Sequence, residues 1–120
     1  MDASRISEIV ALEIAAVSQG ELIDAMRQCL VPPRLEQREW DYSKESTRHP
    51  CWIVLEHRGS NTCIAYCEQG FGPNEPWGLL SISGKDASMG MDDRWYSRLE
   101  DCFRGSPAWD GPNPQGYEVR

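Results

Sequence analysis

The sequence predicts an α+β fold with an N-terminal helical pair, an antiparallel sheet of three to four strands, and a C-terminal helix packed on one face of that sheet. Apolar residues recur at three- and four-residue steps near both ends of the chain, whereas short apolar runs separated by turn residues fill its middle. The links between these runs are too short for the crossovers that parallel strands need. The chain of 120 residues suits a single domain, 1–120.

Two helices are expected before the first pair of prolines. An apolar stripe over residues 4–17 predicts the first helix, with Ser4 as its N-cap. A capping-box pattern that starts at Ser18 predicts a second helix over 19–30. Pro32-Pro33 should end that helix, because proline removes a backbone donor and restricts the residue before it.

The middle of the chain reads as a sheet. Charges of both signs crowd residues 34–49, which indicates a solvated connection containing a short edge strand. Residues 51–55 are apolar on both alternate faces, as in a central strand that is covered on both sides. Turn residues at 58–61 then join this strand to the next one as a β-hairpin. The expected strands are 37–42, 51–55, 62–68 and 79–83.

A third helix is expected over residues 92–104. Its apolar residues include Trp95, Leu99 and Phe103, spaced for one face of a helix, and Asp92 is placed to cap its N-terminus. Prolines and glycines fill residues 106–120, so we expect an irregular tail there, pinned to the body by its aromatic residues.

The net charge and the hydropathy of the chain argue against two classes of function, nucleic-acid binding and membrane association. The net charge is −7, and no cluster of Lys and Arg provides the basic face that binding to nucleic acid requires. No apolar run approaches the roughly 18–20 residues that span a bilayer, and no signal peptide is evident. We therefore expect a cytoplasmic protein that binds neither nucleic acid nor membrane, and whose acidic surface suits a basic partner.

The five cysteines and two histidines are the first candidates for chemistry. An odd number of scattered cysteines suits a reducing compartment. Zinc sites usually show two close ligand pairs, and only Cys63 and Cys67 are closely spaced here. On a strand these two lie about 13 Å apart, too far to share one ion.

No motif for a nucleophile, a metal or a phosphate is present, so we expect no catalytic residue, metal or cofactor.

The loop over residues 68–78 stands out, because glycine and proline on both sides of its tip limit the freedom of its backbone. A rigid loop that displays aromatic residues loses little entropy on binding. An alternative is that its two aromatic residues fold inward and cover the sheet. The candidate contacts to a partner are Glu68, Phe71, Asn74, Glu75 and Trp77, together with Asp92 and Asp93 at the start of the last helix.

In size, charge and organisation, the whole chain resembles the small acidic bacterial immunity and inhibitor proteins. The resemblance implies a non-catalytic protein-binding module, monomeric or homodimeric, that occludes a basic partner such as a toxin or a nuclease. No sequence motif supports this resemblance, so we assign no functional residue of those proteins to this chain. Two alternatives remain open: a small enzyme or ligand-binding domain with a pocket between the sheet and the last helix, and a structural protein that self-associates through an exposed sheet edge.

Overall fold

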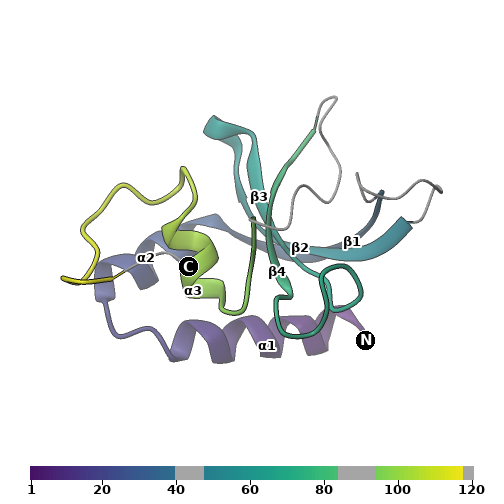
Figure 1. Cartoon of the computed structure of the whole chain (residues 1–120), viewed down its shortest axis with the longest axis horizontal. Helices are drawn as coiled ribbons and strands as arrows, with labels where there is room; N and C mark the ends of the chain where they lie inside the picture. The colour runs from purple at the N-terminus through teal and green to yellow at the C-terminus, as the bar shows by residue number, and fades with distance from the viewer. Residues whose placement is uncertain (40–47, 84–93, 118–120) are drawn as a thin grey trace.

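The computed structural model describes residues 1–39, 48–83 and 94–117 (Figure 1). The described elements follow one another in the order α1 (Ala3–Ala15), α2 (Gly20–Cys29), β1 (Leu30–Glu39), β2 (Arg48–His57), the 3₁₀ turn η1 (Arg58–Ser60), β3 (Thr62–Tyr66), β4 (Trp77–Ser81), β5 (Trp95–Tyr96) and α3 (Leu99–Arg104).

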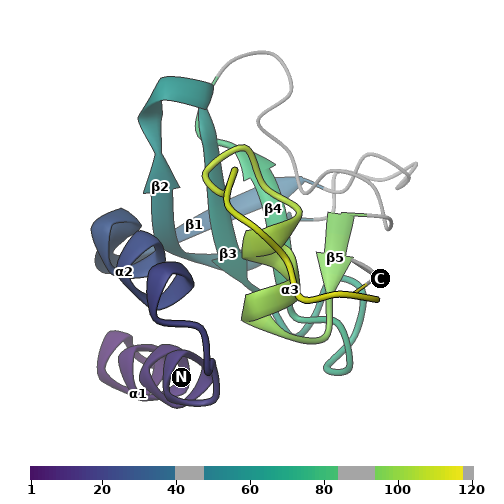
Figure 2. The same cartoon turned by 90° about the vertical axis from the view of Figure 1, so that its left-hand side faces the viewer.

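The strands form one antiparallel meander in the order β1-β2-β3-β4-β5. The described helices α1, α2 and α3 lie on the same side of this sheet, as the two perpendicular views show (Figures 1 and 2). The α+β class, the antiparallel sheet and the C-terminal helix packed on it are thus confirmed. The sheet has five strands in place of the expected three to four.

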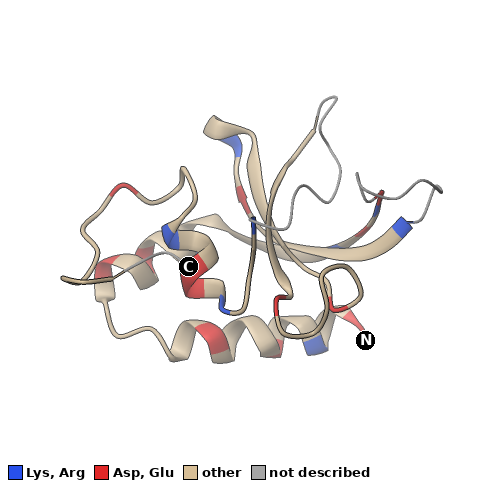
Figure 3. Cartoon of the chain, in the orientation of Figure 1, with Lys and Arg blue, Asp and Glu red and all other residues tan. Residues whose placement is uncertain are grey.

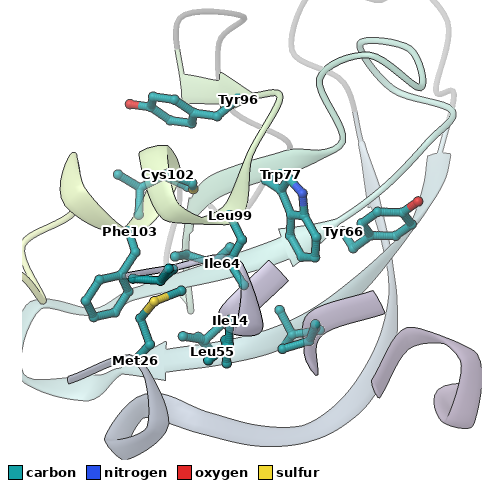
Figure 4. Packing of buried hydrophobic residues seen from close by; sticks show 14 of the residues in the cluster. Ile14, Met26, Leu55, Ile64, Tyr66, Trp77, Tyr96, Leu99, Cys102 and Phe103 are labelled. Atoms are coloured by element: carbon teal, nitrogen blue, oxygen red, sulfur yellow. The ribbon is translucent and has the colours of Figure 1, made fainter. Parts of the chain in front are cut away.

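The main core lies between the helices and the sheet (Figure 4). The apolar stripe of α1 faces inward because its residues recur at four-residue steps and share one side of the helix. These residues share the core with side chains from α2, α3 and four strands, β2 to β5. The fully buried or nearly buried members include Ile6, Val10, Ile14, Leu22, Met26, Leu55, Ile64, Trp77, Leu99 and Phe103.

The opposite face of the sheet is buried as well. Its apolar cluster contains Cys51, Ile53, Cys63, Ala65, Cys67, Leu80 and Trp95. The prediction of a strand covered on both faces is therefore confirmed for β2. Arg38 of β1 crosses this face and donates from Nη1 to the carbonyl of Ser81 in β4, at 2.8 Å. Three strand spacings would separate these strands by about 14 Å on a flat sheet, so the sheet must curl around the second cluster.

The helix starts differ from those expected. Asp2, not Ser4, caps α1, and its carboxylate accepts from the amide of Arg5 at 2.9 Å. The capping box at Ser18 does not form, since the N-cap of α2 is Gln19, whose side chain makes no capping bond. That side chain is engaged elsewhere: its Oε1 accepts from Arg104, at 2.9 Å.

The prediction of a helix over 92–104 is correct only for its last part. Trp95-Tyr96 is strand β5, paired with β4, and α3 begins at Leu99. The amide of Leu99 donates to Oε1 of Glu13 in α1, at 2.9 Å, so a carboxylate from a distant helix satisfies the start of α3. Asp92, the expected cap, lies outside the described residues.

The edge strand β1 begins much earlier than the predicted strand over 37–42. It runs from Leu30 to Glu39 and contains Pro32-Pro33, which ends α2 as expected but does not begin a connection. Proline is tolerated here because β1 lies at the edge of the sheet, where one side of the strand needs no ladder hydrogen bonds.

The described part of the tail, 106–117, forms no helix or strand, and a buried arginine ties it to the body. The Arg104 guanidinium donates to Asn113 at 2.7 Å and to Glu100 at 3.0 Å. It also lies 4.8 Å from the centre of the Tyr117 ring. Together with its bond to Gln19, these contacts join the tail, α3 and the turn between α1 and α2.

Gly78 provides a direct test of the packing on the second face. A Cβ atom there would lie 2.5 Å from the indole of Trp95. We expect Gly78→Ala to lower the free energy of unfolding by about 1–3 kcal/mol, because the buried indole must move. Gly20→Ala is the matched control: no atom lies within 4 Å of its added Cβ, so we expect no loss of stability. Urea denaturation measures both, and a Gly78→Ala protein as stable as the wild type would contradict this packing.

Candidate functional site

The aromatic residues of the predicted binding loop fold inward. Trp77 lies in β4 and is only 2% exposed. Its ring packs edge to face against Tyr66, with centroids 4.9 Å apart. Phe71 is half-buried, 5.5 Å from the ring of Trp95 on the second face. Trp77 is therefore buried within the sheet, and the inward-folded alternative describes both aromatic residues.

The polar members of the loop lie nearer the surface. Glu68 and Asn74 are exposed, and Glu75 is half-buried. Asp92 and Asp93 lie outside the described residues, so the structure does not place them relative to this loop. The described part of the loop thus presents polar side chains rather than an aromatic patch, which moves the search for a binding surface elsewhere.

An apolar groove of about 400 Å³ lies between the N-terminal helices and the edge of the sheet. Its volume falls within the range of about 300–1,000 Å³ that is typical of binding sites. Most of its walls are aliphatic. The groove is lined by Ser7, Val10, Ala11, Ile14 and Ala15 of α1, Ile23 and Arg27 of α2, Leu30, Val31, Pro32 and Pro33 of β1, and Val54 of β2.

An interruption in the strand pairing opens this groove. β1 pairs regularly with β2 from Arg34 onward, but the register shifts between Leu30 and Arg34. The two prolines lie in this stretch, where their missing amides cost no ladder bonds. β2 carries its own register shift against β3 at Val54. The ladder is therefore irregular on both sides of Val54, whose side chain lines the groove.

Among the described residues, two polar side chains line the groove, Ser7 and Arg27. Arg27 is exposed and makes no ion pair with any residue in the described part of the chain. Ile23 and Arg27 lie one helical turn apart and therefore face the same way. The site thus combines an aliphatic floor with a single guanidinium at its margin.

A charged network covers part of the second face of the sheet. Glu36 accepts from Nε of Arg34 at 2.9 Å and from Arg38 at 2.8 Å. Arg34 also donates to the buried carboxylate of Glu56, at 3.0 Å. The sequence predicts a solvated connection over residues 34–49. The charges on β1 instead pair with one another and with β2, because alternate residues of an edge strand share one face.

The network shifts the pKa of the Glu36 carboxylate. Burial alone would raise its pKa, but the hydrogen bonds and charges of Arg34 and Arg38 outweigh burial and hold the pKa below its ordinary value. A lowered pKa in the folded state contributes stability above the unfolded pKa, and that contribution is lost as the pH falls through the folded value. The network therefore stabilises the fold at neutral pH.

Little space remains between the sheet and the last helix, where the ligand-binding alternative places its pocket. The hollow beside Leu55, Ile64 and Phe103 holds about 10 Å³, roughly enough for one water molecule. Among the described residues, the groove between α1, α2 and β1 offers a ligand more space than this hollow does.

The potential metal ligands do not converge. Among the described residues, no three His, Cys, Asp or Glu side chains gather as a metal ion would require. Cys63 and Cys67 lie on the second face together with Cys51, which stands across from Cys67 on the neighbouring strand. This cross-strand relation could not be predicted without the register of β2 and β3.

Comparisons with protein-family models, with curated proteins and with solved structures find no significant match to this chain. Within the described residues, no helix is both long enough and apolar enough to cross a membrane.

The groove is not predicted from the sequence, because Pro32-Pro33 indicates only the end of a helix. A usable signal was present nevertheless. An isoleucine and an arginine one turn apart on α2 are followed closely by the aliphatic and proline residues of 30–33, which concentrates apolar side chains at the predicted end of the second helix.

The charged network makes stability depend on pH. We expect Glu36→Gln to lower the free energy of unfolding by about 1–2 kcal/mol at pH 7, because two arginines lose a charged acceptor. The difference from the wild type should shrink as the pH falls below the ordinary pKa of glutamate and then through the lower pKa of the folded protein, where the wild-type carboxylate becomes protonated as well. Urea denaturation over this pH range measures both effects.

Glu39→Gln is the matched control on the same strand. Within the described part of the chain, Glu39 makes only an exposed ion pair with Arg48, at 3.6 Å, so we expect a change of less than about 0.5 kcal/mol. Equal effects of the two substitutions at pH 7 would contradict a stabilising network centred on Glu36.

Proposed function

We propose that this protein is a protein-binding module of the inhibitor type, which holds apolar side chains of a partner in the groove between α1, α2 and β1. The groove itself is the observation that carries this proposal: about 400 Å³ of open, mostly aliphatic space at the surface of a small domain. Exposed apolar surface of this kind is costly in water and commonly marks a binding site.

Charge indicates what kind of partner would fit. The helical layer that forms the groove is acidic (Figure 3): residues 1–29 contain five carboxylates and two arginines. Glu21 and Asp24 on α2 are exposed. A partner with a basic surface would be attracted to this layer, and the attraction would weaken as salt is added. We therefore infer a basic partner protein that inserts an apolar segment.

The exposed edge of the sheet is a poorer contact surface than the groove. β1 carries two prolines and a series of charged residues from Arg34 to Glu39. Both features are typical of edge strands that avoid pairing with another chain. This favours side-chain binding in the groove over strand addition, and it weakens the alternative of self-assembly through a sheet edge.

The resemblance to immunity and inhibitor proteins supports the same function. Such proteins act by covering the working surface of a toxic enzyme, which requires a stable acidic scaffold and a contact surface but no catalytic group. The cytoplasmic location and the identity of the partner, a toxin or a nuclease, belong to this proposal.

A second candidate function is favoured by Arg27. A lone guanidinium beside an aliphatic groove also suits a small ligand that has an apolar body and an anionic group. In that case the purified protein would carry or bind a small amphipathic anion, and no protein partner would depend on the groove.

Adjacent residues of α1 offer a matched test. Ala11 lines the groove, whereas Leu12 is 66% exposed and does not line it. We expect Ala11→Trp to weaken binding of the basic partner by at least about tenfold, because the indole fills the space that the partner's side chains need. Leu12→Trp should leave binding within about twofold of the wild type. Quantitative affinity capture with both variants and the wild type, each checked for folding by circular dichroism, measures this.

The test also separates the two functions. Partner capture that Ala11→Trp leaves intact would contradict the groove as the contact surface. The fluorescent anion 8-anilinonaphthalene-1-sulfonate probes the second function. Dye binding that depends on Ala11 and Arg27, with no protein captured through the groove, would assign the groove to a small ligand.

A further inference from the structure

Cys51 and Cys67 face each other across two antiparallel strands. Trp52 pairs with Tyr66, so the residues on either side of that pair, Cys51 and Cys67, lie opposite on the second face of the sheet. Cross-strand neighbours have Cα atoms about 4.5–5.5 Å apart, and disulfides need about 4.4–6.8 Å. Each thiol is the first cause of the pKa shift of the other, as expected for two sulfurs in close proximity.

The loop that follows β3 holds the Cys67 sulfur. The backbone amides of Gln69 and Gly70 donate hydrogen bonds to it. The amide of Cys67 itself donates to the carbonyl of Pro76, at 2.8 Å, which fixes the two ends of the loop together. The loop over residues 68–78, which is rich in glycine and proline, thus turns back over Cys67 and directs two backbone amides at its sulfur.

These contacts separate Cys67 from the other cysteines. The hydrogen bond from Cys51 outweighs burial and, with the amides of Gln69 and Gly70, lowers the pKa of Cys67 to about 7. The pKa of Cys51 is raised, first by its bond to Cys67 and then by burial. Burial also raises the pKa of Cys63, to about 11, and those of Cys29 and Cys102.

The charged groups around the pair act in opposite directions. Glu68, the neighbour of Cys67, raises the pKa of that thiol. Arg38, which crosses this face from β1, lowers that of Cys51. Neither charge outweighs the hydrogen bonds, so the pair keeps one reactive sulfur beside one protonated thiol.

Burial limits which oxidant can reach the reactive sulfur. Cys67 is only 1% exposed, which excludes a bulky oxidant such as a disulfide-bonded peptide. A hollow of about 70 Å³ borders Cys67 together with Pro50, Trp52 and Glu68, but Trp52 belongs to the core on the other face of the sheet. The oxidant must therefore be small.

We propose that Cys51 and Cys67 are an oxidation site, a dithiol that a small hydroperoxide converts to an intramolecular disulfide. The Cys67 thiolate attacks one peroxide oxygen, the O–O bond breaks, and hydroxide leaves, which gives a sulfenic acid on Cys67. The Cys51 sulfur then attacks Cys67, and the S–O bond breaks. The departing hydroxide takes the Cys51 proton to form water. The two sulfurs lose two electrons, and the peroxide gains them.

Oxidation with a stoichiometric amount of hydrogen peroxide tests the site. Trypsin cuts after Arg48, Arg58 and Lys85, which places Cys51 in peptide 49–58 and Cys67 in peptide 59–85 together with Cys63. We expect these two peptides to become linked, with a loss of about 2 Da and of two free thiols per chain. The link should persist in Cys63→Ser and disappear in Cys67→Ser. Cys29→Ser is the control that should change nothing.

The rate of linkage should follow the titration of Cys67. With its pKa at about 7, oxidation should be roughly twenty-fold slower at about pH 5.5 than at about pH 7.5, because the thiolate is the attacking form. Loss of the link in Cys63→Ser, a link between chains, or five free thiols after oxidation would each overturn the proposal. The assignment needs only the wild type and Cys63→Ser to fold, and it is independent of the groove.

Discussion

The interruption of the strand ladder at Val54 is the constraint on which the rest of this structure depends. The register shift there lets two neighbours in the sequence, Val54 and Leu55, both face the helices. It also returns Glu56 to the opposite face, where Arg34 neutralises it. Without the shift, every later side chain of β2 would change faces, and a carboxylate would enter the apolar core at a cost of several kcal/mol.

Both proposed sites lie beside that interruption. At the same level of the sheet, β1 departs from regular pairing and its two prolines form one wall of the groove. Before the interruption, the pairing is regular and brings Cys51 opposite Cys67. The sheet is therefore not only a support for the helices. One of its faces shapes an apolar groove, and the other positions a reactive thiol beneath a short loop.

Local patterns predicted the elements whose packing is local. The β2–β3 hairpin and the apolar face of α1 were readable because each depends on residues close in sequence. Leu99 and Phe103 do share the buried face of α3, but the helical spacing of Trp95 to them is coincidental, because Trp95 belongs to a strand and to the other face of the sheet. The start of α3 depends on Glu13, distant in sequence. The groove and the cysteine pair depend on strand register across irregular pairings, which periodicity does not reveal.

Methyl-resolved NMR during titration with the captured partner tests the central claim most directly, because it locates the contact without any substitution. The account predicts that resonances of Ala11, Ile23 and Val54, which line the groove, shift or broaden, while those of Leu80 and Ile82 on the other face do not. Changes confined to the second face and to loop 68–78, with the groove methyl groups unaffected, would contradict it.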